Sequence, residues 1–225
     1  MQPLDYLYLQ MKLEGLTVNR NGWLATLPSG GEDLPLALLA QTADGQFFAG
    51  CRTALPPELH CQLASQATRL SFPDVEPLLQ SLRTAGFQPD VEYFKTYVFP
   101  EPFVRAGSGA VKCLPKDAPA VKDFGFSDFE AQVYTVEDDG KILSACVSSR
   151  QNAECAEAWV FTRPEYRRQG LAQLVVIAWA QGLRAAGVIP FYSHKMENLA
   201  SANLARALGL IPVFDEMVIL ESRRL

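Results

Sequence analysis

The residues best suited to chemistry lie in one short stretch in the second half of the chain, Arg167-Arg168-Gln169-Gly170-Leu171-Ala172. This stretch follows a strand-like run, residues 154–162, and opens a strongly apolar helical run, residues 171–186. The first backbone N–H groups of a helix have no intrahelical partner, and the helix dipole adds partial positive charge there. A glycine turn at such a point favours anions, and the two arginines add fixed cationic charge. We therefore predict a turn that binds a polyphosphate.

Composition limits the classes of protein to consider. The chain has 225 residues and a net charge of −5, which argues against general binding to nucleic acids or anionic membranes. Five cysteines without a C-x-x-C pair, and only two histidines, suggest neither zinc nor a disulfide framework, so we expect no metal. Residues 1–16 lack the features of a signal peptide, and no run is long enough to span a membrane. A cytoplasmic protein is the expectation.

The first half of the chain is predicted to mix helices and strands. Proline and glycine signals, with runs rich in β-branched and aromatic residues, place helices at 1–16, 56–68 and 72–86, and strands at 16–27, 34–42, 46–53 and 91–99. Asp44-Gly45 is typical of a hairpin turn.

A domain boundary is predicted near residue 103. Pro100-Glu101-Pro102 and then Ala106-Gly107-Ser108-Gly109 interrupt the pattern, which gives domains 1–102 and 103–225. The second domain is predicted to have the order β-α-β-β-β-α-β-α-β. Its strands are expected at 110–114, 131–136, 141–148, 154–162, 190–193 and 214–220, and its helices after Pro115 and at 171–186 and 198–208. The strand–Asp-Gly–strand pattern occurs in both halves.

Two motifs in this order resemble the GNAT acyltransferases. The segment 160–172, read VFTRPEYRRQGLA, is similar to the family's V-x-P-E-[YF]-R-x-x-G-x-[GA]. The segment 197–210, read ENLASANLARALGL, is similar to its N-x-x-[AS]…LG[FL] segment. The resemblance covers about the last half of the chain. It implies an α+β fold with a mixed central sheet flanked by helices, and makes the first domain a candidate degenerate relative of the same fold.

The resemblance also implies a site for acetyl-coenzyme A as a co-substrate. In this family the strand before the turn splays from its neighbour, so backbone groups of Phe161 and Thr162 would bond the pantetheine. The N–H groups of residues 169–172 would bind the pyrophosphate. Asn198 would lie near the pantetheine, although asparagine is also a favoured N-cap of any helix. Ser201 belongs to the same segment, where packing is the simpler interpretation.

Glu157 is the best candidate for a general base. It is a lone acid in the apolar run 156–160, and a carboxylate there is costly unless it is paired or faces a cleft. A base helps because an amine is mostly protonated at neutral pH. The competing interpretation is that Glu157 pairs with an arginine or faces solvent.

The acid that protonates the departing thiolate is less well defined. The family often uses a tyrosine at the position of Ala205, so this chain departs from the pattern. Tyr192 is our candidate for a second catalytic residue, with His194, Ser193 and water as alternatives.

Together these features predict an acetyltransferase that moves an acetyl group to the amine of a small molecule by direct attack in a ternary complex. The competing hypothesis is a non-catalytic module that binds coenzyme A. A third makes residues 1–102 a second, inactive copy of the fold that serves to form a homodimer. No nucleic acid or membrane partner is expected.

Overall fold

The computed structural model describes residues 1–19, 23–26, 34–53, 55–67, 75–101, 110–126, 128–129 and 131–222. The chain forms two compact units, and it passes from one unit to the other more than once. The first unit comprises residues 1–96, 194–197 and 212–225, and the second comprises residues 97–193 and 198–211. A boundary near residue 103 stays a prediction, because residues 102–109, which carry most of its proline and glycine signal, lie outside the described residues.

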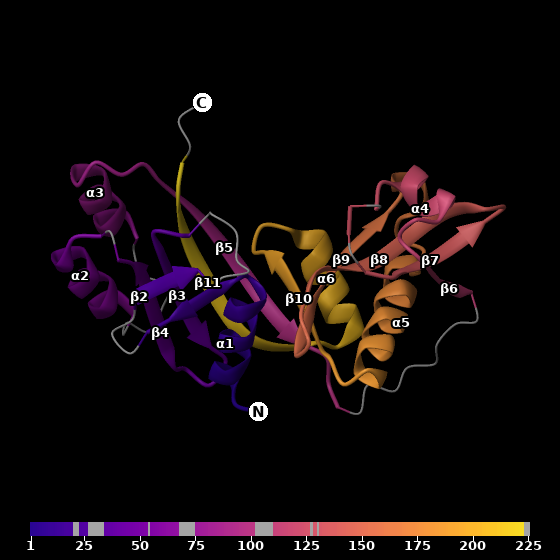
Figure 1. Ribbon diagram of the computed structural model, residues 1–225, viewed down its shortest axis with the longest axis horizontal. Helices are drawn as coiled ribbons and strands as arrows, with labels where there is room; N and C mark the ends of the chain where they lie inside the picture. Colours follow the sequence, from indigo (N-terminus) through magenta and orange to yellow (C-terminus); the bar gives the residue numbers. More distant parts are fainter. Residues whose placement is uncertain are drawn as a thin grey trace. The chain divides into compact units, whose positions relative to one another are not determined.

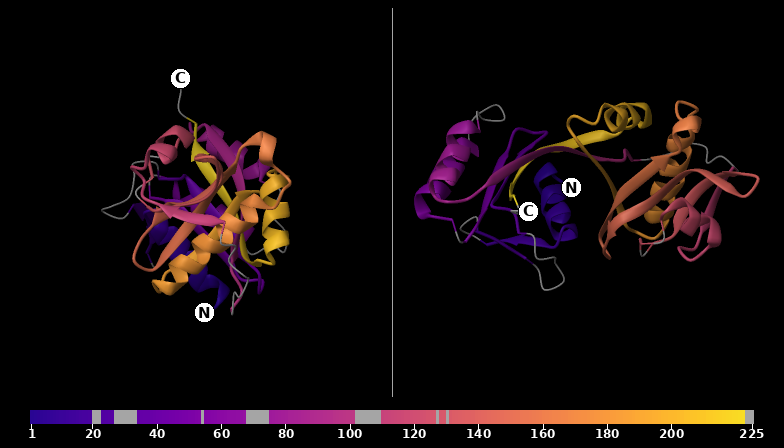
Figure 2. Two further views of the ribbon diagram at one scale, coloured as in Figure 1. Left: turned by 90° about the vertical axis from the view of Figure 1, so that its right-hand side faces the viewer. Right: turned by 90° about the horizontal axis from the view of Figure 1, so that it is seen from above.

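The first unit is a sheet with helices on both of its faces. Its elements are α1 (Pro3–Leu13), β1 (Leu16–Val18), β2 (Trp23–Thr26), β3 (Ala37–Thr42), β4 (Phe47–Arg52), α2 (Pro57–Ala67), α3 (Glu76–Thr84), β5 (Pro89–Val98) and β11 (Ile211–Glu221). The strand order is β1-β2-β4-β3-β11-β5. In the view from above, α2 and α3 lie on one side of these strands and α1 on the other (Figure 2). Buried leucines of α3 pack with Met217 and Ile219 of β11.

The second unit has the layered α+β arrangement predicted from the motifs (Figure 1). Its elements are β6 (Val111–Leu114), α4 (Pro119–Phe124), β7 (Val133–Asp138), β8 (Lys141–Gln151), β9 (Cys155–Thr162), the 3-10 turn η1 (Pro164–Tyr166), α5 (Leu171–Ala185), β10 (Ile189–Lys195, whose last two residues group with the first unit) and α6 (Leu199–Leu208). The strand order is β10-β9-β8-β7-β6, with β10 parallel to β9 and the others antiparallel. One apolar cluster joins α5 and α6 to the sheet, and another joins α4 to it.

Every helix and strand predicted for the second half of the chain is present in the predicted order. The Asp44-Gly45 hairpin is also confirmed, since β3 and β4 pair antiparallel and Gly45 has a φ of +84°. One prediction was wrong in detail: residues 16–27 hold two antiparallel strands, β1 and β2, and not one. Another was too short, because β8 runs three residues beyond the predicted end at Ser148.

The predicted divergence of the strand before the glycine turn is confirmed. β10 pairs with β9 over only three residues of each strand, Ile189–Phe191 with Cys155–Glu157. β9 continues to Thr162, and its pairing with β8 extends to that residue. From Ala158 onward β9 therefore leaves β10, and Glu157 lies at the closed end of the opening.

All five cysteines are free thiols; Cys51, Cys146 and Cys155 are buried, whereas Cys61 and Cys113 are exposed. Along the described parts of the chain, no helix combines the length and apolar character that crossing a membrane requires.

Candidate active site

The glycine turn has the conformation expected of an anion site. Gly170 is the residue before α5 and has a φ of +79°, in the left-handed region that favours glycine. A Cβ atom placed on Gly170 would meet nothing within 4 Å, so the turn borders open space. The segment that leads to the turn is fastened to the sheet by Arg163, whose Nε donates to the carbonyl of Ile142 at 2.7 Å. The N-terminal amides of α5 thus lie next to a space that a ligand can enter.

One of the two arginines predicted to supply cationic charge beside the turn, Arg167, contacts the end of β9. Nε of Arg167 donates to the carbonyl of Thr162 at 3.1 Å, and its guanidinium lies 5.8 Å from the ring centre of Phe161. The hydroxyl of Ser144 donates to the carbonyl of Phe161 at 3.3 Å. Both carbonyls assigned to pantetheine binding therefore already have protein donors. A carbonyl oxygen has two lone pairs, so a second donor can still bind.

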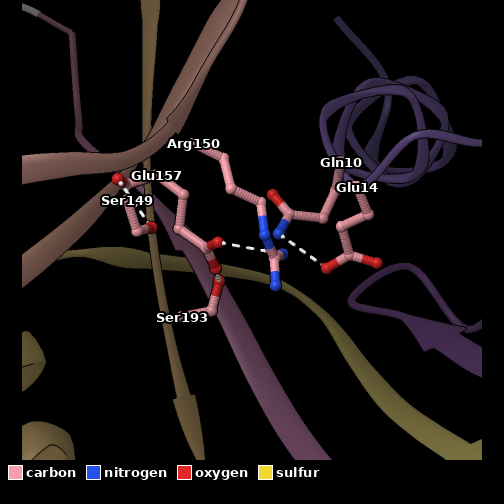
Figure 3. Close-up of polar contacts among 6 residues, drawn as sticks. All are labelled: Gln10, Glu14, Ser149, Arg150, Glu157 and Ser193. Carbon is pink, nitrogen blue, oxygen red and sulfur yellow. Dashed lines mark hydrogen bonds and ion pairs between the residues drawn. The ribbon is translucent and has the colours of Figure 1, made fainter. Parts of the chain in front are cut away.

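Glu157 is held by side chains from both neighbouring strands (Figure 3). The hydroxyl of Ser193 on β10 donates to Oε1 at 2.5 Å, and Nη1 of Arg150 on β8 donates to Oε2 at 3.2 Å. The Ser149 hydroxyl also donates to the backbone carbonyl of Glu157 at 3.2 Å. The Glu157 side chain is 13% exposed, against 49% for Arg150. The pairing with an arginine, one of the two interpretations left open by the sequence, is therefore present.

Sequence reasoning missed Arg150 and placed Ser193 elsewhere. Arg150 lies directly opposite Glu157 in the β8–β9 register, just after a shift of register that follows Ser148. Opposite charges at facing positions of a hairpin indicate a pair, but the predicted strand ends at residue 148 and so does not include Arg150. Ser193 is an alternative proton donor in the sequence analysis, and its contact with Glu157 depends on the parallel pairing of β9 and β10.

Tyr192, Asn198 and Ser201 come together where β10 leads into α6. The side chain of Asn198 accepts a hydrogen bond from the backbone N–H of Ser201 at 3.1 Å, which makes it the N-cap of α6. The Tyr192 side chain is hydrogen-bonded to Ser201 and is 2% exposed. Burial raises the pKa of Tyr192 to about 12, while the hydrogen bond to Ser201 acts in the opposite direction. Strand alternation puts Tyr192 on the face of β10 opposite to Phe191, the register partner of Glu157.

Residues 125–215 match the family model of the GNAT acetyltransferases. This region is a GNAT acetyltransferase domain. The domain runs from β7 into the first residues of β11 and therefore includes the glycine turn, Glu157 and the N-terminus of α6. Members of the family use acetyl-CoA as acyl donor, so the activity that the domain implies is acetyl-CoA-dependent acyl transfer.

Two solved structures resemble the whole chain in fold. One is a protein from Novosphingobium aromaticivorans assigned to the GNAT family, with 17% identity, a TM-score of 0.55, and coverage of 99% of this chain and 100% of that one. The other is a GCN5-related N-acetyltransferase from Kribbella flavida, with 11% identity, a TM-score of 0.52, and coverage of 100% and 97%. No curated protein matches the chain.

Two other positions in or near the GNAT domain bear on the unassigned proton donor. Ala205, which takes the place of the family's frequent tyrosine, is 1% exposed and packs in the core with α5. His194 is 7% exposed, and its Nδ1 lies 2.8 Å from the carbonyl oxygen of Lys195. His194 groups with the first unit of the chain.

Proposed function

We propose that the protein transfers the acetyl group of acetyl-CoA to the amine of a small molecule, by direct attack within a ternary complex. The observation that carries this proposal is the opening between β9 and β10, which has Glu157 at its closed end. The glycine turn follows from the other end of β9, so donor and acceptor functions lie along one strand.

The donor side is the turn and the diverging strand. The amides at residues 169–172, at the start of α5, are suited to a pyrophosphate because their dipoles and the charge of Arg168 favour anions. Backbone groups of Phe161 and Thr162 would hold the pantetheine. Asn198 and Ser201 would contribute by fixing the start of α6, where the N-cap bond is present.

The acceptor side is the carboxylate of Glu157. The amine nitrogen attacks the thioester carbonyl, the carbon–sulfur bond breaks, and the thiolate of CoA leaves. The proton lost by the nitrogen passes to Glu157, directly or through one water. Ser193 and Arg150 orient the carboxylate from opposite sides, and this limits the geometries from which it can accept a proton.

The thiolate must regain a proton to complete the reaction. Tyr192 remains our candidate, because a tyrosine phenol is protonated at neutral pH and can donate its proton. Its hydrogen bond to Ser201 places the hydroxyl at the start of α6, where the sequence motif lies. Protonation by water is the alternative route.

A non-catalytic module that binds CoA is the second candidate. Two observations favour it: Ala205 replaces the family's frequent tyrosine, and the Glu157 carboxylate is engaged by Arg150. The two candidates differ in turnover and not in CoA binding. An amine panel with acetyl-CoA therefore separates them, because the module would bind acetyl-CoA and acetylate no amine.

The variant Glu157→Gln tests the proposed mechanism. It keeps the shape of the side chain and removes the charge, so we expect affinity for acetyl-CoA to stay nearly constant and kcat to fall roughly a hundredfold at pH 7. The loss should shrink at high pH, where the amine is already neutral. Glu154→Gln, an exposed acid just before the same strand, is the matched control. Full activity of Glu157→Gln at pH 7 would reduce Glu157 to a structural role.

A further inference from the structure

Two large aromatic side chains on β9 remain exposed beside the proposed base. Trp159 is 53% exposed and Phe161 is 40% exposed. Strand alternation puts both on the face of β9 that carries Glu157. Exposed clusters of apolar side chains are uncommon on monomeric proteins and often mark binding sites.

The exposed rings belong to a connected aromatic surface. The ring centres of Trp159 and Phe129 are 6.2 Å apart, and those of Phe161 and Phe124 are 5.6 Å apart. Phe126, which is buried, contacts both Phe124 and Phe129, at 5.0 and 5.5 Å. The exposed rings are therefore held by a buried anchor. Side chains that are already packed together lose little conformational entropy when a ligand binds to them.

Two arginines border these rings. The guanidinium of Arg163 lies 5.1 Å from the ring centre of Phe124, and that of Arg167 lies 5.8 Å from the ring centre of Phe161. Two of the rings thus already have a cation over one face. A second positive group on the acceptor, as in a polyamine, would be repelled by these arginines.

We propose that the acceptor is an arylalkylamine, with its amine at Glu157 and its aromatic ring stacked on Trp159 and Phe129. This inference rests on the acetyltransferase activity proposed above. Positions two apart on one face of a strand are about 7 Å apart, which matches the reach of an amine joined to a ring by two carbon atoms. A neutral ring also suits the cationic border formed by Arg163 and Arg167.

Steady-state kinetics with saturating acetyl-CoA test this inference. The acceptors are 2-phenylethylamine, n-propylamine and 1,4-diaminobutane. We expect kcat/KM to be at least tenfold higher for 2-phenylethylamine than for the other two. Trp159→Ala should raise KM for 2-phenylethylamine roughly tenfold and leave the values for n-propylamine within about twofold, whereas Trp159→Phe should retain most of the preference.

The control is Ile211→Ala, which truncates an apolar side chain that is 48% exposed and is outside the aromatic surface. It should leave the preference unchanged. Equal turnover of the three amines, or a preference for 1,4-diaminobutane, would overturn the inference while leaving acetyl transfer intact.

A direct measurement of amine binding distinguishes failure of the arylalkylamine inference from failure of the proposed acetyltransferase function. If no amine is acetylated, the proposed function is wrong, and calorimetric titration of the CoA-loaded protein with 2-phenylethylamine decides about the surface. A Kd about tenfold weaker in Trp159→Ala than in the wild type would support an arylalkylamine site. An unchanged Kd, or no binding to the wild-type protein, would refute it.

Discussion

The contacts of Glu157 with its partners orient its carboxylate more than they stabilise the fold. Its ion pair with Arg150 is half exposed on the arginine side, and such pairs contribute at most about 1 kcal/mol to folding. The same contact, together with the Ser193 hydroxyl, fixes the direction of the carboxylate. We infer that substitutions of either partner would affect the rate of reaction more than the free energy of unfolding.

Gly170→Glu should abolish binding of acetyl-CoA. The new side chain would enter the open space at the turn, and its charge would repel the phosphates. The matched control is Gly187→Glu, because Gly187 follows the other end of α5, has a similar φ of +77° and also faces open space. Both variants carry similar backbone strain. Calorimetry should detect lost affinity only in Gly170→Glu, and equal affinities in two folded variants would refute the phosphate site.

Tyr192→Phe should flatten the alkaline limb of the stability curve. An unfolded tyrosine has a pKa near 10, and burial raises the pKa of Tyr192 to about 12 in the folded protein. The stability linked to its proton is therefore fully present below about pH 10 and is lost as the pH rises towards 12. Urea unfolding across this pH range should show that the wild type loses on the order of 2 kcal/mol more free energy of unfolding than Tyr192→Phe does. Parallel curves for the two proteins would contradict the assignment.

The element that organises the site is α5. Its N-terminus forms the phosphate turn, its middle packs in the core, and its last turn is tied to residues 99–100 by Arg184, which donates to the carbonyls of Phe99 and Pro100. Trp179 adds a bond from its Nε1 to the Ser148 hydroxyl at 3.0 Å. The turn is therefore positioned by contacts made along the whole helix.

α5 and the strands around it were predictable because each carries its own local signal. The helix has a long apolar pattern ended by Gly187, and the β7–β8 hairpin has an acidic turn ended by Gly140. The partners of Glu157 were not predictable in this way. Arg150 faces Glu157 only because of a register shift in β8, and Ser193 only because β10 pairs in parallel with β9. Register and strand order are set by the tertiary fold, and no short stretch of sequence carries a signal for them.

Gly182→Ala should destabilise the protein, although alanine favours helices by about 1 kcal/mol over glycine. A Cβ atom at Gly182 would lie 2.0 Å from the hydroxyl oxygen of Tyr134 and 2.9 Å from the adjoining ring carbon. Overpacking of this kind costs about 1–3 kcal/mol, so the clash should win. Tyr134→Phe removes the nearer atom and should recover part of the loss. Urea unfolding of the two single variants and the double variant measures this coupling, and additive effects would show that the ring moves aside freely.

At the scale of the whole molecule, the family match and the compact units do not coincide. The GNAT match ends at residue 215, within β11, and β11 belongs almost entirely to the first unit. There it pairs antiparallel with β3 from Phe214 to Ile219. A fold built from chain segments that return to an earlier unit cannot be divided by one cut without separating paired strands.

The fragment 103–225 should therefore fold poorly on its own, even though it contains the complete family match. It keeps β11 but loses β3, which exposes side chains of β11 that are buried in the full chain, among them Phe214, Met217 and Ile219. Each such side chain contributes about 1.5–3 kcal/mol through burial, and the bare strand edge is a template for aggregation.

The matched comparison is the fragment 97–211, which follows the limits of the second unit and omits nearly all of β11. We expect 97–211 to stay soluble at higher concentration than 103–225, as measured by light scattering, and to unfold more cooperatively in urea. Cooperative unfolding of 103–225, with the affinity for acetyl-CoA of the full chain, would show that β11 needs no partner from the first unit. That result would favour two domains separated near residue 103, because residues 103–225 would then contain all that the second domain needs to fold and to bind acetyl-CoA.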